Sequence, residues 1–126
     1  MRIAAVDQGT TSTRVLLVAD GEAPRVAAAH RHAAHHPKPG WVEHDPEELL
    51  ANIRRCLEAV GPVDAIGLDN QGETCLAWDA ETGRPAGRAI VWQDARTAPE
   101  LEALKAKGAE ALVQERAGLP LDPYFS

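Results

Sequence analysis

Residues 5–14 read Ala-Val-Asp-Gln-Gly-Thr-Thr-Ser-Thr-Arg and place an acid and a small, hydroxyl-rich turn between two apolar runs. The first run, Ile3–Val6, and the second, Val15–Val18, have the apolar and β-branched composition of buried strands. Gly9 supplies the backbone freedom that a tight turn needs. We therefore expect a β-hairpin at the start of the chain, with the hydroxyl-rich turn at its tip.

The composition of this turn suits an anion. Thr10, Thr11, Ser12 and Thr13 offer hydroxyls and closely spaced backbone N–H groups, which together can form an anion-binding concavity. Asp7 ends the first strand, where a cation can sit, and Arg14 opens the second. A plain hairpin turn explains the same residues, because hydroxyl-rich turns are common. The local pattern leaves phosphate binding and a plain turn equally open.

Length and charge narrow the class of protein. A chain of 126 residues, 44% apolar and 25% charged, has the size and composition of one globular domain. Its apolar runs are much shorter than the roughly 20 residues of a membrane span, and its first residues lack a signal-peptide pattern, so we expect a cytoplasmic protein without membrane contact. The net charge of −6 with no basic stripe argues against nucleic acid as a partner.

The cysteines and histidines do not predict a metal centre. Two cysteines, Cys56 and Cys75, have neither the number nor the spacing of a disulfide framework or a zinc site, and we interpret them as small buried hydrophobic residues. The histidines are crowded, but no cysteine or acid completes a ligand set beside them, so a solvated strand face or loop is favoured. They are His30, His32, His35, His36 and His44.

A helix is predicted from Pro46 to Val60. Asp45 can cap it, Pro46 suits the first helical position, and the two glutamates that follow favour the positive end of the helix dipole. Gly61 and Pro62 end the helix, whose apolar face should cover a sheet. The apolar positions at helical spacing are Leu49, Leu50, Ile53, Leu57 and Val60.

The other segments predict a sheet, a hairpin and two short helices. An extended stretch at 25–35 completes an antiparallel meander with the first hairpin. A fourth strand at 63–68 ends in the polar cluster 69–71, at the strand end where α/β folds place ligands. The remaining expected elements are a hairpin of 74–78 with 88–92 and helices at 97–107 and 110–116.

An acid and two aromatic residues form a second candidate site. Glu73 follows the polar cluster, and Trp92 and Tyr124 lie further along; together they can offer hydrogen bonds to hydroxyls and apolar faces to C–H groups of a small polyhydroxyl compound. Core or edge positions are the commoner role of such aromatics. Asp94 and Arg96 are interpreted as a surface ion pair of little energetic value.

Several motifs follow one another in a recognisable order. Val6–Arg14 comes first, residues 37–46 second and residues 121–126 last, and between them lie Asn70-Gln71 with Glu73-Thr74, Ile90–Gln93 and Arg96-Thr97. This set resembles the FGGY carbohydrate kinases, and most of all their glycerol kinase branch. Val6–Arg14 is similar to the first phosphate loop of that family.

The resemblance implies a fold and an activity. The fold class is α/β: a ribonuclease-H-like (actin-like ATPase) fold, present here as an N-terminal domain fragment with a mixed sheet and flanking helices. In such kinases two domains close on a cleft and transfer the γ-phosphoryl group of ATP to a hydroxyl of a sugar or polyol. ATP and Mg²⁺ are the implied cofactors, and a small polyol or sugar is the implied substrate.

The resemblance also implies roles for individual residues. Asp7 is expected near the transferred phosphate and near the metal, which it would contact through water. Glu73, Trp92 and Tyr124 fall on polyol-contacting positions. The residues expected to bind phosphate or nucleotide are Gln8, Gly9, Thr10, Thr11, Ser12 and Arg14.

Two positions depart from the glycerol kinase pattern. Gly72 stands where those kinases generally carry an arginine, which removes a forked, charged donor to a substrate hydroxyl and leaves space for a longer polyol or a ketose. Asp94-Ala95 replaces a bulkier, more basic pair. We therefore keep a kinase for a pentulose or larger polyol as an alternative.

The length of the chain sets a further expectation. Residues 1–126 are expected to be a partial N-terminal substrate-binding domain, with the C-terminal nucleotide-binding domain missing and the catalytic base beyond this chain, so the chain alone should be inactive. The alternative is a free-standing, non-catalytic binding or regulatory module of the same fold. A homo-oligomer is compatible with either.

Overall fold

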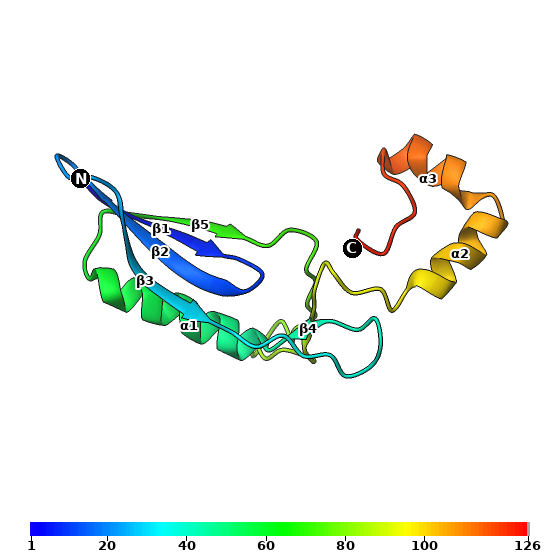
Figure 1. Cartoon of the computed structure of the whole chain (residues 1–126), viewed down its shortest axis with the longest axis horizontal. Helices are drawn as coiled ribbons and strands as arrows, with labels where there is room; N and C mark the ends of the chain where they lie inside the picture. Colours follow the sequence, from blue (N-terminus) through cyan, green and yellow to red (C-terminus); the bar gives the residue numbers. More distant parts are fainter. Residues whose placement is uncertain (126) are drawn as a thin grey trace.

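A computed structural model describes residues 1–125. Figure 1 shows a sheet backed by a helix at one end of an elongated molecule and a helix pair at the other. The elements are β1 (Arg2–Gln8), β2 (Ser12–Ala19), β3 (Arg25–Arg31), β4 (Glu43–His44), α1 (Pro46–Val60), β5 (Ala65–Asn70), β6 (Ala89–Ile90), α2 (Ala98–Ala106) and α3 (Ala109–Ala117).

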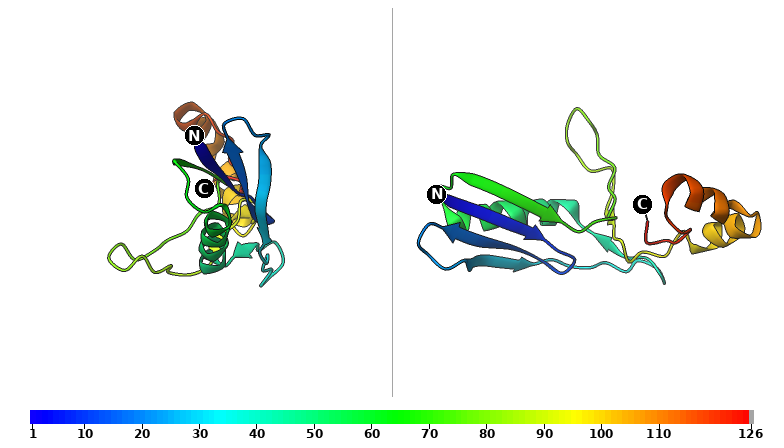
Figure 2. Two further views of the ribbon diagram at one scale, coloured as in Figure 1. Left: turned by 90° about the vertical axis from the view of Figure 1, so that its left-hand side faces the viewer. Right: turned by 90° about the horizontal axis from the view of Figure 1, so that it is seen from above.

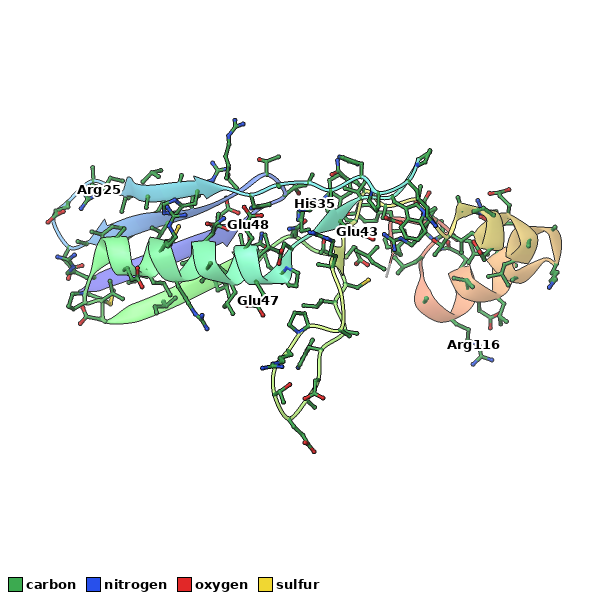
Figure 3. The ribbon with its side chains drawn as sticks, turned by 90° about the horizontal axis from the view of Figure 1, so that it is seen from below. Arg25, His35, Glu43, Glu47, Glu48 and Arg116 are labelled. Carbon is green, nitrogen blue, oxygen red and sulfur yellow. The ribbon has the colours of Figure 1, made fainter. Side chains whose placement is uncertain are left out.

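The larger sheet is mixed, as predicted. Its strand order is β3-β2-β1-β5, with β2 antiparallel to both β1 and β3 and with β5 parallel to β1. In the β1–β2 register Asp7 lies opposite Arg14, so the predicted hairpin is confirmed. β3 is shorter than the predicted stretch and ends at Arg31. The backbone pairs again at His35, which exchanges hydrogen bonds of 2.8 and 2.9 Å with Glu43 (Figure 3).

Helix α1 covers one face of this sheet. It begins as predicted, because the Asp45 carboxylate accepts a hydrogen bond of 3.0 Å from the Glu47 N–H and Pro46 occupies the first turn. Its buried positions include Asn52, whose amide donates to the Arg31 carbonyl at 3.2 Å, whereas Leu50 is exposed, contrary to prediction. The core between helix and sheet consists of Ala4, Val6, Val15, Leu17, Cys56 and Val60.

Strand β5 lies beside the helix-covered face but outside the cover of α1. In the parallel register Ile66 pairs with Ala4 and Leu68 with Val6, so these two side chains point to the same side of the sheet as the core. Ile66 is nevertheless 57% exposed and Leu68 61% exposed. An apolar strip therefore runs along this edge of the sheet.

A long hairpin projects from the molecule between β5 and β6. Figure 2 shows it standing away from both layers. The predicted pairing is reduced to β6, which pairs with β4, and to single bridges between Cys75 and Ile90 and between Trp78 and Pro85. Cys75 is exposed, which corrects the prediction that it is buried, because little of the chain packs against the hairpin; Cys56 is buried as predicted.

The helix pair α2 and α3 confirms the two predicted short helices. Gly108 separates them with a φ of 78°, a left-handed conformation that favours glycine. Among residues 1–125, no helix is long and apolar enough to cross a membrane.

Candidate functional site

The turn between β1 and β2 presents unused donors to solvent. Gly9 N–H closes the turn by donating to the Ser12 carbonyl at 3.0 Å. Within the described residues, the N–H groups of Thr10 and Thr11 donate no hydrogen bond. These two N–H groups and the hydroxyls of Thr10, Thr11 and Ser12 are therefore available to an anion. Thr13 is fully buried, which corrects the prediction that its hydroxyl contributes, because alternate residues of β2 face the core.

Gly9 is required because the neighbouring atoms of the turn leave little room for a side chain. Its φ is not among the positive values of the chain, which corrects the expectation that the turn needs unusual backbone freedom there. A Cβ at this position would lie 3.3 Å from the Ser12 carbonyl oxygen and 3.5 Å from Oδ1 of Asp7. A side chain would therefore press on the turn and on the acid that precedes it.

Asp7 and Arg14 form an ion pair across the base of the turn. Arg14 Nε lies 3.1 Å from Asp7 Oδ2, and the two side chains are 49% and 44% exposed. Val6 and Gln8 point into the core, so Asp7 points to the opposite face of the sheet, where Asp69 of β5 is its register partner. The carboxyl ends of the parallel strands β1 and β5 thus bring acids to one edge, where α/β folds place ligands.

Gln8 lies in the interior behind the turn. It is buried, and its side-chain amide donates to the Gly9 carbonyl at 2.9 Å. Gln71, which follows β5, reaches the same group: its amide nitrogen lies 3.4 Å from the Gly9 carbonyl and 3.3 Å from His44 Nδ1. Gln71 therefore ties the end of β5 to the turn.

Two histidines pack against each other behind the turn. The rings of His32 and His44 are 4.6 Å apart, edge to face, and His32 Nε2 lies 2.9 Å from the Thr10 carbonyl, to which it donates. An amide nitrogen only donates, so His44 Nδ1 accepts from Gln71 and the ring proton is on Nε2. Burial lowers the pKa of His44 to about 4, with His32 and His35 adding to this effect and Glu48 opposing it.

These positions correct the prediction of a solvated histidine cluster. His44 is 1% exposed, although His36 lies in an exposed loop as expected. No group of three metal-ligating side chains occurs within residues 1–125. His32 and His44 are thus part of the support behind the turn.

A cavity of about 200 Å³, called here the Trp92 cavity, lies next to the turn. Its lining includes Glu73, Trp92, Asp94, Arg96 and Phe125. The Trp92 indole Nε1–H donates to Thr10 Oγ1 at 2.9 Å, which joins the cavity to the turn. The structure thus brings the two candidate sites together.

The acid and aromatic residues of the cavity have distinct positions. Glu73 has a φ of 61°, an uncommon conformation for a residue with a side chain. Tyr124 is not among the lining residues, but its ring packs edge to face on Trp92 at 5.6 Å. Gly72 has no described atom within 4 Å of a Cβ built on it, so a side chain fits there. Phe125, which the sequence analysis missed, follows Tyr124 directly.

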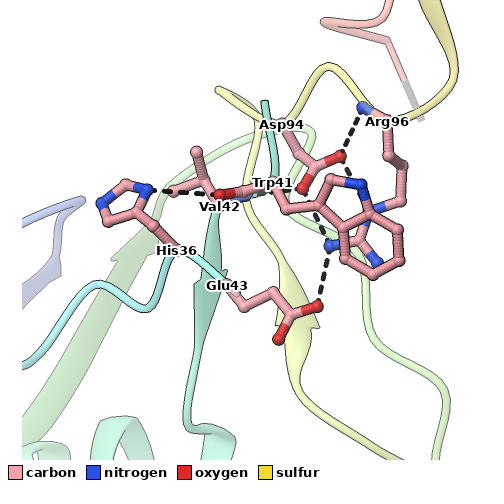
Figure 4. A network of polar contacts seen from close by, with 6 residues as sticks. All are labelled: His36, Trp41, Val42, Glu43, Asp94 and Arg96. Atoms are coloured by element: carbon pink, nitrogen blue, oxygen red, sulfur yellow. Dashed lines mark hydrogen bonds and ion pairs between the residues drawn. The ribbon is translucent and has the colours of Figure 1, made fainter. Parts of the chain in front are cut away.

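A buried ion network holds one side of the Trp92 cavity (Figure 4). Arg96 donates to Asp94 at 2.8 Å and to Glu43 at 2.8 Å, and its guanidinium lies 3.8 Å from the centre of the Trp41 ring. The side chain of Asp94 is 3% exposed and that of Arg96 19%. The prediction of a surface pair is therefore wrong, because the segment containing Glu43 and Trp41 folds over both residues.

The network fixes the charges of its members. Burial on its own raises the pKa of Asp94, but hydrogen bonds from Arg96 and from the Val42 N–H lower it below its usual value. The hydrogen bond to Asp94 is the main cause that raises the pKa of Arg96. Asp94 and Arg96 therefore stay charged at neutral pH, and their mutual hydrogen bonds make the network a rigid support.

A larger hollow of about 450 Å³ lies along the projecting hairpin. Its lining of Cys75, Arg88 and mostly small or apolar residues offers no acid and no contact with the turn. The Trp92 cavity is therefore the better candidate for polar chemistry.

Comparison with known proteins places this geometry in a family. The model of the N-terminal domain of the FGGY family of carbohydrate kinases matches residues 2–126. This chain belongs to that family. A glycerol kinase from Citrifermentans bemidjiense is 48% identical over 130 residues, which cover 97% of this chain and 26% of that protein. This FGGY chain therefore spans about a quarter of the length of the curated relatives it matches.

Solved structures show the same architecture. Plasmodium falciparum glycerol kinase, crystallised with ADP, is 31% identical and superposes with a TM-score of 0.88 over 99% of this chain and 27% of its own. Ligand-bound xylulose kinase from Lactobacillus acidophilus is 19% identical, with a TM-score of 0.89 over 98% of this chain and 26% of its own. The predicted ribonuclease-H-like (actin-like ATPase) fold, as a fragment of the N-terminal domain, is confirmed.

Proposed function

We propose that this chain is the N-terminal, substrate-binding part of an ATP-dependent kinase that phosphorylates a hydroxyl of a small polyol, as a glycerol kinase does. The observation that carries the proposal is the 2.9 Å hydrogen bond between Trp92 and Thr10, because it joins an anion-receptive turn to a cavity with an acid and aromatic rings. The exposed Ile66 and Leu68 also favour this proposal, because an apolar strip on a sheet is normally covered and a further part of the protein could cover it.

In this proposal the turn residues handle phosphate. The free N–H groups of Thr10 and Thr11 and the guanidinium of Arg14 meet the transferred phosphoryl group, whose negative charge they offset. Gly9 and Ser12 keep the turn closed, and Gln8 supports it from inside. Asp7, which pairs with Arg14 here, would hold Mg²⁺ through water, and Arg14 would then be available to the phosphate.

The carboxylate of Asp7 fits the proposed Mg²⁺. This ion keeps several waters and takes one or two protein carboxylates together with substrate phosphates, so a half-exposed acid at a strand end suits a contact through water. When bound with ATP, the ion neutralises charge on the phosphates. The cytoplasm, where ATP is available, is the proposed site of action.

The Trp92 cavity is proposed to bind the polyol. Glu73 accepts hydrogen bonds from two hydroxyls, and the face of Trp92 contacts C–H groups. Tyr124, which packs on the Trp92 ring just outside the lining, is proposed to contact the part of the polyol that extends beyond the cavity. The base that takes the proton from the attacking hydroxyl is proposed to lie in the part of the kinase beyond this chain. Residues 1–126 alone should therefore bind polyol at most weakly and transfer no phosphate.

A coupled assay of ATP consumption tests the proposal. The full-length protein should phosphorylate glycerol or a related polyol, and residues 1–126 expressed alone should not. Activity of the isolated chain would contradict the missing base. Absence of transfer to polyols, ketoses and sugars by the full-length protein would overturn the proposed activity.

A longer polyol or a pentulose is a second candidate substrate. The open space at Gly72 favours it, because no described atom lies within 4 Å of a Cβ built on this residue. Gly72→Arg should raise the preference for glycerol over xylulose, measured as a ratio of kcat/KM, by about tenfold, since a forked donor adds a charged hydrogen bond. Gly87→Arg, on the projecting hairpin, is the matched control. An unchanged ratio would show that specificity is set elsewhere.

A further inference from the structure

The hydrogen bond between Trp92 and Thr10 has a fixed direction. An indole N–H is only a donor, so Thr10 Oγ1 must be the acceptor at 2.9 Å. In the described part of the chain, no group accepts the proton of the Thr10 hydroxyl. That proton therefore has to point to a group outside the described chain.

The rest of Thr10 and of Trp92 is held in place. The Thr10 carbonyl accepts from His32 at 2.9 Å, so the backbone cannot easily rotate the hydroxyl away. The Trp92 N–H donates to Thr74 Oγ1 at 3.2 Å, and the Thr74 hydroxyl donates to Gln71 Oε1 at 3.0 Å. Hydrogen bonds to neighbouring residues thus hold both Thr10 and Trp92 in place.

We propose that Trp92 is a positioning residue for phosphate as well as a wall of the polyol cavity: its indole N–H occupies the acceptor side of Thr10 Oγ1 and directs the hydroxyl proton to an oxygen of the transferred phosphate. This inference rests on the proposed kinase activity. The hydroxyl is then oriented before the phosphate arrives, so little reorganisation is needed in the transition state.

This role differs measurably from that of a cavity wall. A wall that touches substrate equally in the ground and transition states changes KM for the polyol. A group that orients a donor to the moving phosphoryl group changes kcat, and its effect disappears once the donor is removed. A double-mutant cycle on Trp92 and Thr10 separates the two.

The experiment measures kcat and polyol KM of the full-length kinase for Trp92→Phe, Thr10→Val and the double variant. Each single substitution should lower kcat about tenfold, and the double variant should be no slower than Thr10→Val alone, since both remove one hydrogen bond to phosphate. Thr10→Ser keeps the hydroxyl and should restore kcat to within about threefold of wild type. Trp78→Phe, on the projecting hairpin, is the matched control for the ring change and should leave kcat unchanged.

A second variant guards against simple loss of packing. Replacing Trp92 with β-(3-benzothienyl)alanine keeps the size of the ring and removes only the N–H, and it should lower kcat about as much as Trp92→Phe, about tenfold. A kcat equal to wild type with this analogue, or fully additive losses in the double variant, would overturn the inference. A wild-type protein without any polyol phosphorylation would overturn the proposed function itself, and this inference with it.

Discussion

The β1–β2 turn and the Trp92 cavity are built in different ways. The turn consists of consecutive residues between two paired strands, so its donors come together whenever the hairpin forms. The cavity is lined by separate segments that contain Glu73, Trp92 with Arg96, and Phe125, and a buried ion network holds one side of it. The comparison teaches that local sequence determines the turn and its N–H donors, whereas the cavity depends on tertiary packing.

The largest expected effect tests the turn. Asp7→Asn in the proposed full-length kinase should lower kcat by roughly 10³-fold with little change in polyol KM, because the variant loses a charge that acts mainly in the transition state. Asp20→Asn, at the opposite end of the hairpin, is the control and should keep kcat. A change confined to KM would remove Asp7 from the chemistry.

The next effect tests the support of the cavity. Arg96→Met should destabilise the protein by about 3 kcal/mol, because it leaves the Asp94 carboxylate buried without its main partner. Lys105→Met, which breaks the exposed pair with Glu102, should cost less than about 0.5 kcal/mol. Urea denaturation measures both. Equal losses would mean that the buried network adds no special stability.

A pH titration tests the link between the two regions. The pKa of His44 is lowered from 6.5 to about 4 in the folded protein. Between these two pH values the unfolded chain therefore binds a proton at this histidine that the folded chain does not. The free energy of unfolding should therefore be unaffected by His44 above pH 6.5 and should fall by roughly 2–3 kcal/mol as the pH is lowered from 6.5 to 4.

The control for this titration is a second histidine. His44→Gln should flatten the dependence of the unfolding free energy on pH, while His36→Gln, in an exposed loop, should keep it. If both variants retain the slope between pH 6.5 and 4, His44 is not its source.

The smallest effect tests the cavity as a polyol site. Glu73→Gln should raise the polyol KM about tenfold, equivalent to about 1.4 kcal/mol, because a charged acceptor to hydroxyls becomes neutral. kcat should change much less than in Asp7→Asn. The exposed Glu81→Gln on the projecting hairpin serves as control. A polyol KM equal to that of wild type would place the substrate elsewhere.

The sequence predicted what depends on neighbours in the chain. The hairpin, α1 with its Asp45 cap, and the break at Gly108 follow from local patterns, and the structure confirms them. The two-residue strand β4 and the burial of Asp94 were missed, since both arise when the segment before α1 folds over residues far along the chain.

The burial of His44 could not be predicted from its position in the sequence either. A histidine just before a helix start is commonly solvated, and only contact with His32 and Gln71 makes this one part of the interior. A partial signal existed: Glu43 and Arg96 are opposite charges inside motifs that the family resemblance singled out. Pairing such charges across motifs would have suggested the network.

The uncovered strip along β5 bears on how residues 1–126 behave when they are produced alone. Ile66 and Leu68 sit on a strand at the margin of the sheet, and an apolar strand with an open edge is a template for pairing with another copy. Self-association of the isolated chain would then arise from this exposed edge of the sheet rather than from the assembly of the proposed full-length protein. Oligomeric state is therefore a question for the full-length protein.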